Sequence, residues 1–226
     1  KVTVVGAGNV GATCADVLAY REIANEIVLL DIKEGVSEGK ALDIFQKSPI
    51  TLYDSRTIGV TNDYARTANS DVVVITSGIP RKPGMSRDDL IGVNAGIVKQ
   101  VAENVAKYSP NAVIVVVSNP LDVMTFQAHM ATGFSRNKVI GMAGVLDSSR
   151  LACFVAMELG VSADDVKAIV MGGHGDTMVS LYECVSVGGI PLPQLMDRET
   201  FDRIAARTAN AGGEIVELLV RGSAFY

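Results

Sequence analysis

The sequence predicts a doubly wound parallel α/β sheet followed by a second domain of the α+β class. Short runs rich in valine and isoleucine alternate with longer helical patterns up to about Gly141, an order typical of parallel strands joined by right-handed helical crossovers. Most of these runs are apolar throughout, as expected for strands buried on both faces. After about Asp147 the elements become shorter and less regular. We therefore predict one domain over residues 1–143 and a second over residues 144–226.

The first domain is expected to contain strands and helices in strict alternation. The strands are expected at Val2–Val5, Glu26–Asp31, Asp71–Ser77, Ala112–Val117 and Lys138–Gly141. The helices are expected at Val10–Tyr20, Gly39–Gln46, Asp88–Tyr108 and Asp122–Thr132, and Gly133 suits a left-handed cap at the end of the last one.

The second domain is expected to open with a helix at Ser148–Leu159 that ends at Gly160. A short strand at Val166–Met171 and another at Val179–Val187 follow. A long helical pattern covers Glu199–Leu219 and is interrupted by two adjacent glycines at 212 and 213.

Composition excludes several classes of function. The net charge is −5 and no basic run occurs, which argues against nucleic acid or an anionic membrane as a partner. No apolar run reaches the roughly 18 residues that a membrane span needs. The cysteines Cys14, Cys153 and Cys184 lie far apart, so we expect reduced thiols that pack as small residues in a cytoplasmic protein, with neither a disulfide framework nor a metal site.

A glycine fingerprint follows the first expected strand directly and opens the first expected helix. It reads Gly6-Ala7-Gly8-Asn9-Val10-Gly11, and Asp31 ends the next strand 20 positions after its last glycine. In a Rossmann domain such glycines allow a tight turn, close approach of the backbone to a pyrophosphate, and packing of helix on strand. The acidic residue favours NAD over NADP because it would repel a 2′-phosphate. The alternative is a glycine-rich turn that binds nothing.

Two further expected strands end in polar residues, at Thr76-Ser77-Gly78 and Ser118-Asn119-Pro120. Ligands of doubly wound sheets bind at the carboxyl ends of the strands. Asn119 is therefore a candidate contact for the cofactor ribose and the substrate, although an Asn-Pro pair also simply forms turns.

The segment from Gly78 to Arg87 predicts a loop that closes over an open site. Two prolines and two glycines occur there with three cations, and such loops commonly act as lids. Arg81 and Arg87 are the candidates for substrate contact. Each also has an ordinary alternative, since Arg81 can be a solvated loop charge and Arg87 can pair with the acidic residues that follow it.

A histidine, a carboxylate and a guanidinium in the second domain form a plausible set for proton transfer and anion binding. His174 lies in Gly172-Gly173-His174-Gly175-Asp176, and Asp147 and Arg150 lie upstream in turn-like sequence. Histidine exchanges protons readily near neutral pH, and a nearby carboxylate fixes its tautomer. Arginine binds carboxylates through two parallel hydrogen bonds. The chain's other histidine, His129, is expected near a helix end, where it complements the helix dipole.

The sequence resembles the lactate/malate dehydrogenase superfamily in six segments that follow the family's order. They are GAGNVG, Asp31, IPRKPGMSR, SNP, GVLDSSR and GGHGD. Within this superfamily the sequence looks like the lactate-dehydrogenase-like malate dehydrogenases of bacteria and archaea. The resemblance runs over the whole chain. It implies a homodimer or homotetramer, and it implies that roughly the last quarter of the family's length would follow Tyr226.

The resemblance assigns roles to five of the residues above. It implies that His174 is the acid/base of hydride transfer between (S)-malate and NAD, giving oxaloacetate and NADH. It implies that Asp147 orients His174, that Arg150 binds the substrate carboxylate, and that Arg87 polarises the reacting carbonyl. It places Arg81 at the discriminating position, where lactate enzymes usually carry glutamine.

The resemblance also implies that Asn119 contacts both the reacting oxygen and the cofactor, and that the NAD site is lined by Asn94 and by the backbone of Val117, Ser118 and Asn119. Physical chemistry agrees with malate as the substrate, because its second carboxylate needs a cation opposite it, and enclosing Arg81 against a methyl group would leave that cation unpaired. A lactate or other 2-hydroxy-acid dehydrogenase is the alternative. NAD-using glycosidases of this fold and a module that only binds NAD are more distant ones.

Overall fold

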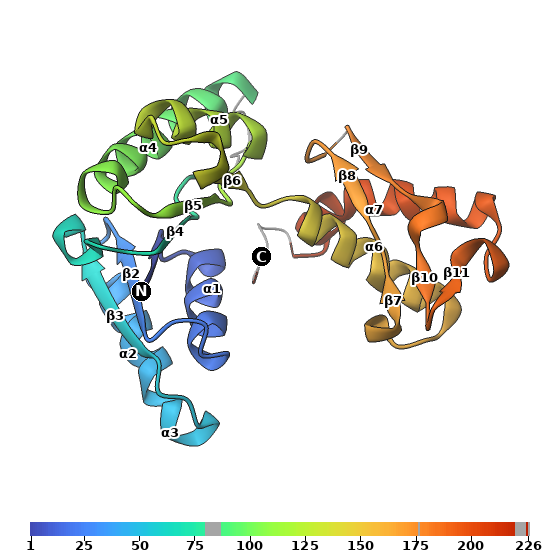
Figure 1. Ribbon diagram of the computed structural model, residues 1–226, viewed down its shortest axis with the longest axis horizontal. Coiled ribbons are helices and arrows are strands. Elements are labelled where there is room, and N and C mark those ends of the chain that lie inside the picture. Colours follow the sequence, from blue (N-terminus) through green and yellow to red (C-terminus); the bar gives the residue numbers. More distant parts are fainter. Residues whose placement is uncertain (80–86, 176, 220–224, 226) are drawn as a thin grey trace. The chain divides into compact units, whose positions relative to one another are not determined.

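A computed structural model describes residues 1–79, 87–175, 177–219 and 225, with no side-chain description for Arg87. The chain divides into two compact units, of which the first spans Lys1–Gly141 and the second begins at Met142 (Figure 1). The sequence places this boundary between residues 143 and 144. Each unit has its own core, as independent domains do.

The first unit is built on a parallel sheet of six strands. Their order is β3-β2-β1-β4-β5-β6, the order of a Rossmann fold. The strands are β1 (Val2–Val5), β2 (Glu26–Asp31), β3 (Arg56–Thr61), β4 (Val72–Ile75), β5 (Val113–Val116) and β6 (Val139–Gly141). The predicted doubly wound sheet is therefore confirmed. All residues of β1 are buried, and so are all residues of β2 except the two at its ends.

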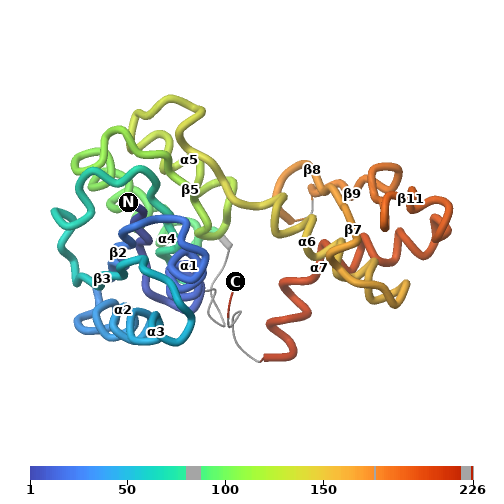
Figure 2. The backbone as a smooth tube through the Cα atoms, turned by 60° about the horizontal axis from the view of Figure 1, so that its bottom comes forward, coloured from blue at the N-terminus to red at the C-terminus, as the bar shows by residue number. Residues whose placement is uncertain are grey.

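Helices cover both faces of this sheet. They are α1 (Asn9–Tyr20), α2 (Val36–Gln46), α3 (Ser48–Thr51), α4 (Arg87–Tyr108) and α5 (Leu121–Thr132). Helix α1 packs with α2, and α4 packs with α5 (Figure 1). Helix α2 runs on into α3 and lies against β3 (Figure 2). Gly133 ends α5 in the left-handed conformation that the sequence predicts.

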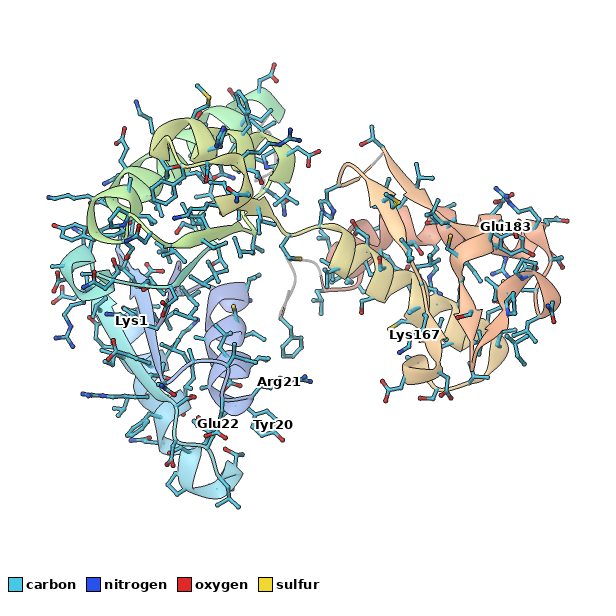
Figure 3. All side chains as sticks on the ribbon, in the orientation of Figure 1. Lys1, Tyr20, Arg21, Glu22, Lys167 and Glu183 are labelled. Atoms are coloured by element: carbon cyan, nitrogen blue, oxygen red, sulfur yellow. The ribbon has the colours of Figure 1, made fainter. Side chains whose placement is uncertain are left out.

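One strand of the sheet was not predicted. Strand β3 reads Arg-Thr-Ile-Gly-Val-Thr, with a glycine in its middle and only two buried residues. It lies at the edge of the sheet, where one side of a strand faces no neighbour and a continuous apolar run is not needed. Lys1, labelled in Figure 3, directly precedes β1. It forms an ion pair with Glu26 of the neighbouring strand β2 at 3.0 Å.

The second unit is of the α+β class. It contains α6 (Gly144–Leu159), β7 (Val166–Lys167), β8 (Val170–Gly172), β9 (Met178–Ser180), β10 (Ser186–Val187), β11 (Ile190–Pro191) and α7 (Arg198–Leu219). Strands β11, β10 and β7 form one antiparallel sheet, and β8 pairs with β9 in a hairpin. Helices α6 and α7 pack on each other. Their core includes Leu151 and Phe201, with the rings of Phe201 and Tyr182 4.8 Å apart.

Several predicted elements of this unit differ in detail. The run Val166–Met171 divides into β7 and β8, which belong to different sheets, and Val179–Val187 divides into β9, a short 3-10 helix and β10. Helix α6 begins four residues before the predicted Ser148. Helix α7 continues through its two glycines, because burial of one face outweighs the roughly 1 kcal/mol that each glycine costs a helix.

The cysteines follow the prediction in part. All three are free. Cys14 is half-buried, and its burial raises the pKa of its thiol. Cys153 and Cys184 are exposed, so the expectation that all three pack inside is wrong for these two. Within the described ranges, no helix is long and apolar enough to cross a membrane, and no cluster of histidine, cysteine or acidic side chains is arranged to hold a metal ion.

The close approach of β3 to α2 gives a test of the fold. A Cβ atom on Gly59 would lie 2.2 Å from the carbonyl oxygen of Ser37, whereas one on Gly39, in α2, would meet nothing within 4 Å. Gly59→Ala should lower the free energy of unfolding by about 1–3 kcal/mol through overpacking. Gly39→Ala should raise it by about 0.5–1 kcal/mol because alanine favours the helix. Urea denaturation followed by circular dichroism measures both, and equal effects of the two variants would contradict the packing of β3 on α2.

Candidate functional site

The glycine fingerprint forms a tight loop between β1 and α1. Gly6 has a φ of +105°, and a Cβ there would lie 2.8 Å from the hydroxyl of Thr76 and 2.9 Å from the backbone nitrogen of Ser77. A Cβ on Gly11 would lie 1.8 Å from the carbonyl oxygen of Gly6. No other residue type fits these two positions. Gly8 instead borders open space, which leaves room for a ligand to approach its backbone.

Asp31 connects this loop to the end of β2. One oxygen of its carboxylate accepts the backbone N–H of Ala7 at 2.6 Å, and the other accepts that of Lys33 at 2.9 Å. Each carboxylate oxygen has two lone pairs, so these bonds leave acceptors for ribose hydroxyls. Asn9 and Val10 open α1 directly after the loop, and the positive end of a helix dipole favours phosphate. The loop and the acid therefore fit a dinucleotide.

Asn94 holds the ends of β4 and β5 together from helix α4. Its side chain is buried, with 2% of the residue exposed. Its Oδ1 accepts the N–H of Ile79 at 2.9 Å, and its Nδ2 donates to the carbonyl oxygens of Ile79 at 3.2 Å and of Asn119 at 2.7 Å. The resemblance implies that Asn94 lines the cofactor site. The structure shows that its amide positions the backbone of both strand ends.

The other predicted residues at these strand ends lie together. Val117 and Ser118 donate their backbone N–H groups to Ile75, at 2.9 and 3.3 Å. The Ser118 hydroxyl donates to the carbonyl oxygen of Ser77 at 2.5 Å. Asn119 is exposed, so its side-chain amide is open to a ligand. Arg81 lies outside the described residues, and Arg87 begins α4 with a side chain that is likewise not described.

In the second unit, His174 and Arg150 share the carboxylate of Asp147. Nδ1 of His174 lies 2.9 Å from one carboxylate oxygen, and Nη1 of Arg150 donates to the other at 3.3 Å. The Asp147 side chain is 2% exposed, against 24% for His174 and 19% for Arg150. A buried carboxylate fixes the ring with Nδ1 toward itself, which leaves Nε2 as the nitrogen that can exchange a proton.

Local sequence explains how these side chains meet. Asp147 and Arg150 lie in the first turns of α6, whereas the predicted helix begins only at Ser148 and leaves Asp147 in a turn. Three residues apart on a helix, they share one face. His174 follows β8 in the tight turn of the β8–β9 hairpin, where Gly172 and Gly175 have φ values of +90° and +101°. Asp176 lies outside the described residues.

Two residues that sequence reasoning missed hold the hairpin against α6. The hydroxyl oxygen of Ser148 accepts the backbone N–H of Val170 at 2.9 Å. A Cβ on Gly144 would lie 3.1 Å from the carbonyl oxygen of Val170, so the glycine permits this close approach. Val170 begins the strand that leads to His174. The pair of contacts therefore sets the distance between Asp147 and His174, and no local sequence pattern marks it.

Comparison with known proteins matches both units of the chain to one family. Residues 1–141 match the family model described as the lactate/malate dehydrogenase NAD binding domain, and residues 144–226 match that of the α/β C-terminal domain. A malate dehydrogenase of Cytophaga hutchinsonii is 67% identical over 219 residues, covering 97% of this chain and 70% of that protein.

Solved structures give the same result. The malate dehydrogenase of Salinibacter ruber has a TM-score of 0.92 at 52% identity and covers 98% of this chain and 70% of its own. A lactate dehydrogenase of Cryptosporidium parvum, complexed with lactic acid and nicotinamide adenine dinucleotide, has a TM-score of 0.92 at 43% identity and covers 99% and 72%. The chain belongs to the lactate/malate dehydrogenase family of oxidoreductases, and its first unit is the family's NAD-binding domain.

Proposed function

We propose that the protein is an NAD-dependent malate dehydrogenase that converts (S)-malate and NAD⁺ reversibly to oxaloacetate and NADH. The observation that carries this proposal is the buried carboxylate of Asp147, which holds His174 with one oxygen and Arg150 with the other. That arrangement supports a role for His174 as proton acceptor and for the neighbouring Arg150 as carboxylate binder. The malate dehydrogenases among the relatives support the choice of substrate.

The cofactor fits the first unit because Gly8 borders open space and the carboxylate of Asp31 keeps lone pairs for a ribose. Bound NAD supplies the acceptor of the hydride. The described residues that would hold it are those of the glycine loop, Asp31 and the ends of β4 and β5, with Asn119 exposed at the second of these.

The proton belongs to His174. As the C–H bond of the alcohol carbon breaks and its electron pair leaves with the hydride, the hydroxyl proton moves to Nε2 of the imidazole. The ring then carries a positive charge, which the carboxylate of Asp147 stabilises at 2.9 Å from Nδ1. In the reverse direction the same imidazolium returns its proton to the new alkoxide oxygen.

Arg150 binds the carboxylate next to the reacting carbon. Only its Nη1 is used by Asp147, at 3.3 Å, and the guanidinium has further donors for a two-pronged contact. Following the family resemblance, we assign the second carboxylate of malate to Arg81 and the polarisation of the reacting carbonyl to Arg87. Following the same resemblance, we propose that the protein forms a homodimer or homotetramer.

A substrate panel tests the proposal. With NADH as the reductant, oxaloacetate should be reduced with a higher kcat/KM than pyruvate, because pyruvate leaves Arg81 without a carboxylate. Arg81→Gln should lower kcat/KM for oxaloacetate by at least about a hundredfold, since it removes the cation opposite a charged group, and should raise the value for pyruvate. A faster reaction with pyruvate in the unaltered protein would contradict malate as the substrate and favour a lactate dehydrogenase.

Ser148 gives a second test, on the positioning of His174. Ser148→Ala removes the acceptor for the N–H of Val170, which loosens the hairpin that carries the histidine. We expect kcat for oxaloacetate reduction to fall by about tenfold, the scale of one lost hydrogen bond, with the dissociation constant for NADH unchanged. Ser149→Ala is the matched control, because Ser149 is its exposed neighbour on α6. Equal kcat values for the two variants would remove Ser148 from this role.

A further inference from the structure

Lys40 reaches from helix α2 to the glycine loop. Its ammonium donates to the carbonyl oxygen of Ala7 at 2.7 Å and to that of Gly8 at 3.3 Å. The side chain is only partly exposed, whereas lysines usually extend into water. Neither motif nor spacing drew attention to this residue in the sequence.

Acidic side chains are available nearby, and Lys40 forms its hydrogen bonds with the loop nonetheless. A groove between α1 and α2 is lined by Asp16, Lys40, Asp43 and Lys47. It is Lys47 that forms the ion pair with Asp16. The ammonium of Lys40 is directed to two backbone carbonyls, which are the negative ends of the peptide dipoles.

The bond to Ala7 fixes the orientation of one peptide unit, and the bond to Gly8 supports a second, whose carbonyl oxygen also accepts the N–H of Ala12 at 3.1 Å. In a trans peptide the N–H points away from the C=O of the same unit. When the carbonyls of Ala7 and Gly8 turn toward Lys40, the N–H groups of Gly8 and Asn9 turn to the opposite side. Those are the groups at the start of α1, where a pyrophosphate binds in a Rossmann loop.

Ala7 is held from both sides. Asp31 accepts its N–H at 2.6 Å and Lys40 donates to its carbonyl at 2.7 Å. The residue is 1% exposed. A loop held at both polar groups loses little conformational freedom when it binds a ligand, which raises affinity.

We propose that Lys40 is a positioning residue of the cofactor site, which holds the carbonyls of the glycine loop so that the N–H groups on the opposite side face the pyrophosphate. The inference rests on the NAD site of the proposed function. It goes beyond the fingerprint, whose glycines leave room for a phosphate but do not by themselves fix the direction of the loop's N–H groups. It assigns the pyrophosphate, and not the adenosine, as the part of the dinucleotide that depends on this lysine.

The test compares ligands with and without a pyrophosphate. NADH binding is followed by fluorescence, and ADP-ribose and adenosine binding by calorimetry, on the full chain. Lys40→Met should raise the dissociation constants of NADH and ADP-ribose by about tenfold or more, the scale of hydrogen bonds from a charged group. Adenosine should bind with an unchanged constant. Lys40→Arg, which keeps the charge and the donors, should restore most of the affinity.

Lys99→Met is the matched control. It removes the same charge from the same unit. The Lys99 side chain is exposed, and its ammonium lies 3.9 Å from the carboxylate of Glu103. All three ligands should bind to this variant as to the unaltered protein. Circular dichroism checks folding, and Lys40→Gln repeats the comparison if the methionine variant does not fold.

Two results would overturn the proposal. One is an unchanged dissociation constant for ADP-ribose in Lys40→Met. The other is an equal loss for adenosine, which would show that Lys40 acts on the nucleotide site as a whole. Failure of the unaltered protein to bind NADH would instead contradict the proposed function. The two failures are distinguishable, because this one is measured on the unaltered protein and the others on the Lys40 variant.

Discussion

The second unit depends on one buried charge. The carboxylate of Asp147 is almost fully removed from water, and an isolated carboxylate in that position would cost several kcal/mol or lose its charge. His174 and Arg150 each take one of its oxygens. The positive end of α6 adds to this, since Asp147 lies in the first turn of that helix. The same interaction that makes the charge tolerable fixes the tautomer of the histidine and the place of the arginine.

The first unit applies the same principle to its backbone. Asp31, Lys40 and Asn94 each satisfy main-chain groups of a loop at the carboxyl edge of the sheet. Loops of this kind carry function because a rigid scaffold positions them. In both units, polar side chains from neighbouring helices or strands hold the backbone that presents the functional groups. Pre-organisation of this type lowers the entropy that binding or catalysis would otherwise cost.

Local sequence was sufficient to predict part of the fold and of the site. The five apolar runs, the glycine fingerprint and the acid at the end of β2 have periodicity and spacing of their own, and the sheet confirms the fold that they predict. Strand β3 escaped because an edge strand with a central glycine carries little apolar signal. The early start of α6 escaped because a helix that begins at Gly144 has no N-cap side chain to mark it.

The contacts that complete the site were not predicted from the sequence for a different reason. Ser148 acts on a residue 22 positions away, and Lys40 on one 33 positions away. Such pairs become neighbours only when the chain has folded, and both residue types are common on surfaces. The assignment of malate depends on Arg81, whose role comes from the resemblance. The fold could thus be predicted from periodicity, whereas the positioning residues depend on contacts that form only in the folded chain.

The central claim is that Asp147 and His174 act as one proton-transfer unit. The most direct measurement is kcat for oxaloacetate reduction in Asp147→Asn, in His174→Asn and in the double variant, with NADH binding measured in parallel. Each single variant should lose at least about a hundredfold in kcat, and the double variant should be no slower than the slower single one, because residues of one unit are not additive. NADH should bind all three equally. Full kcat in Asp147→Asn, or losses that multiply in the double variant, would contradict the claim.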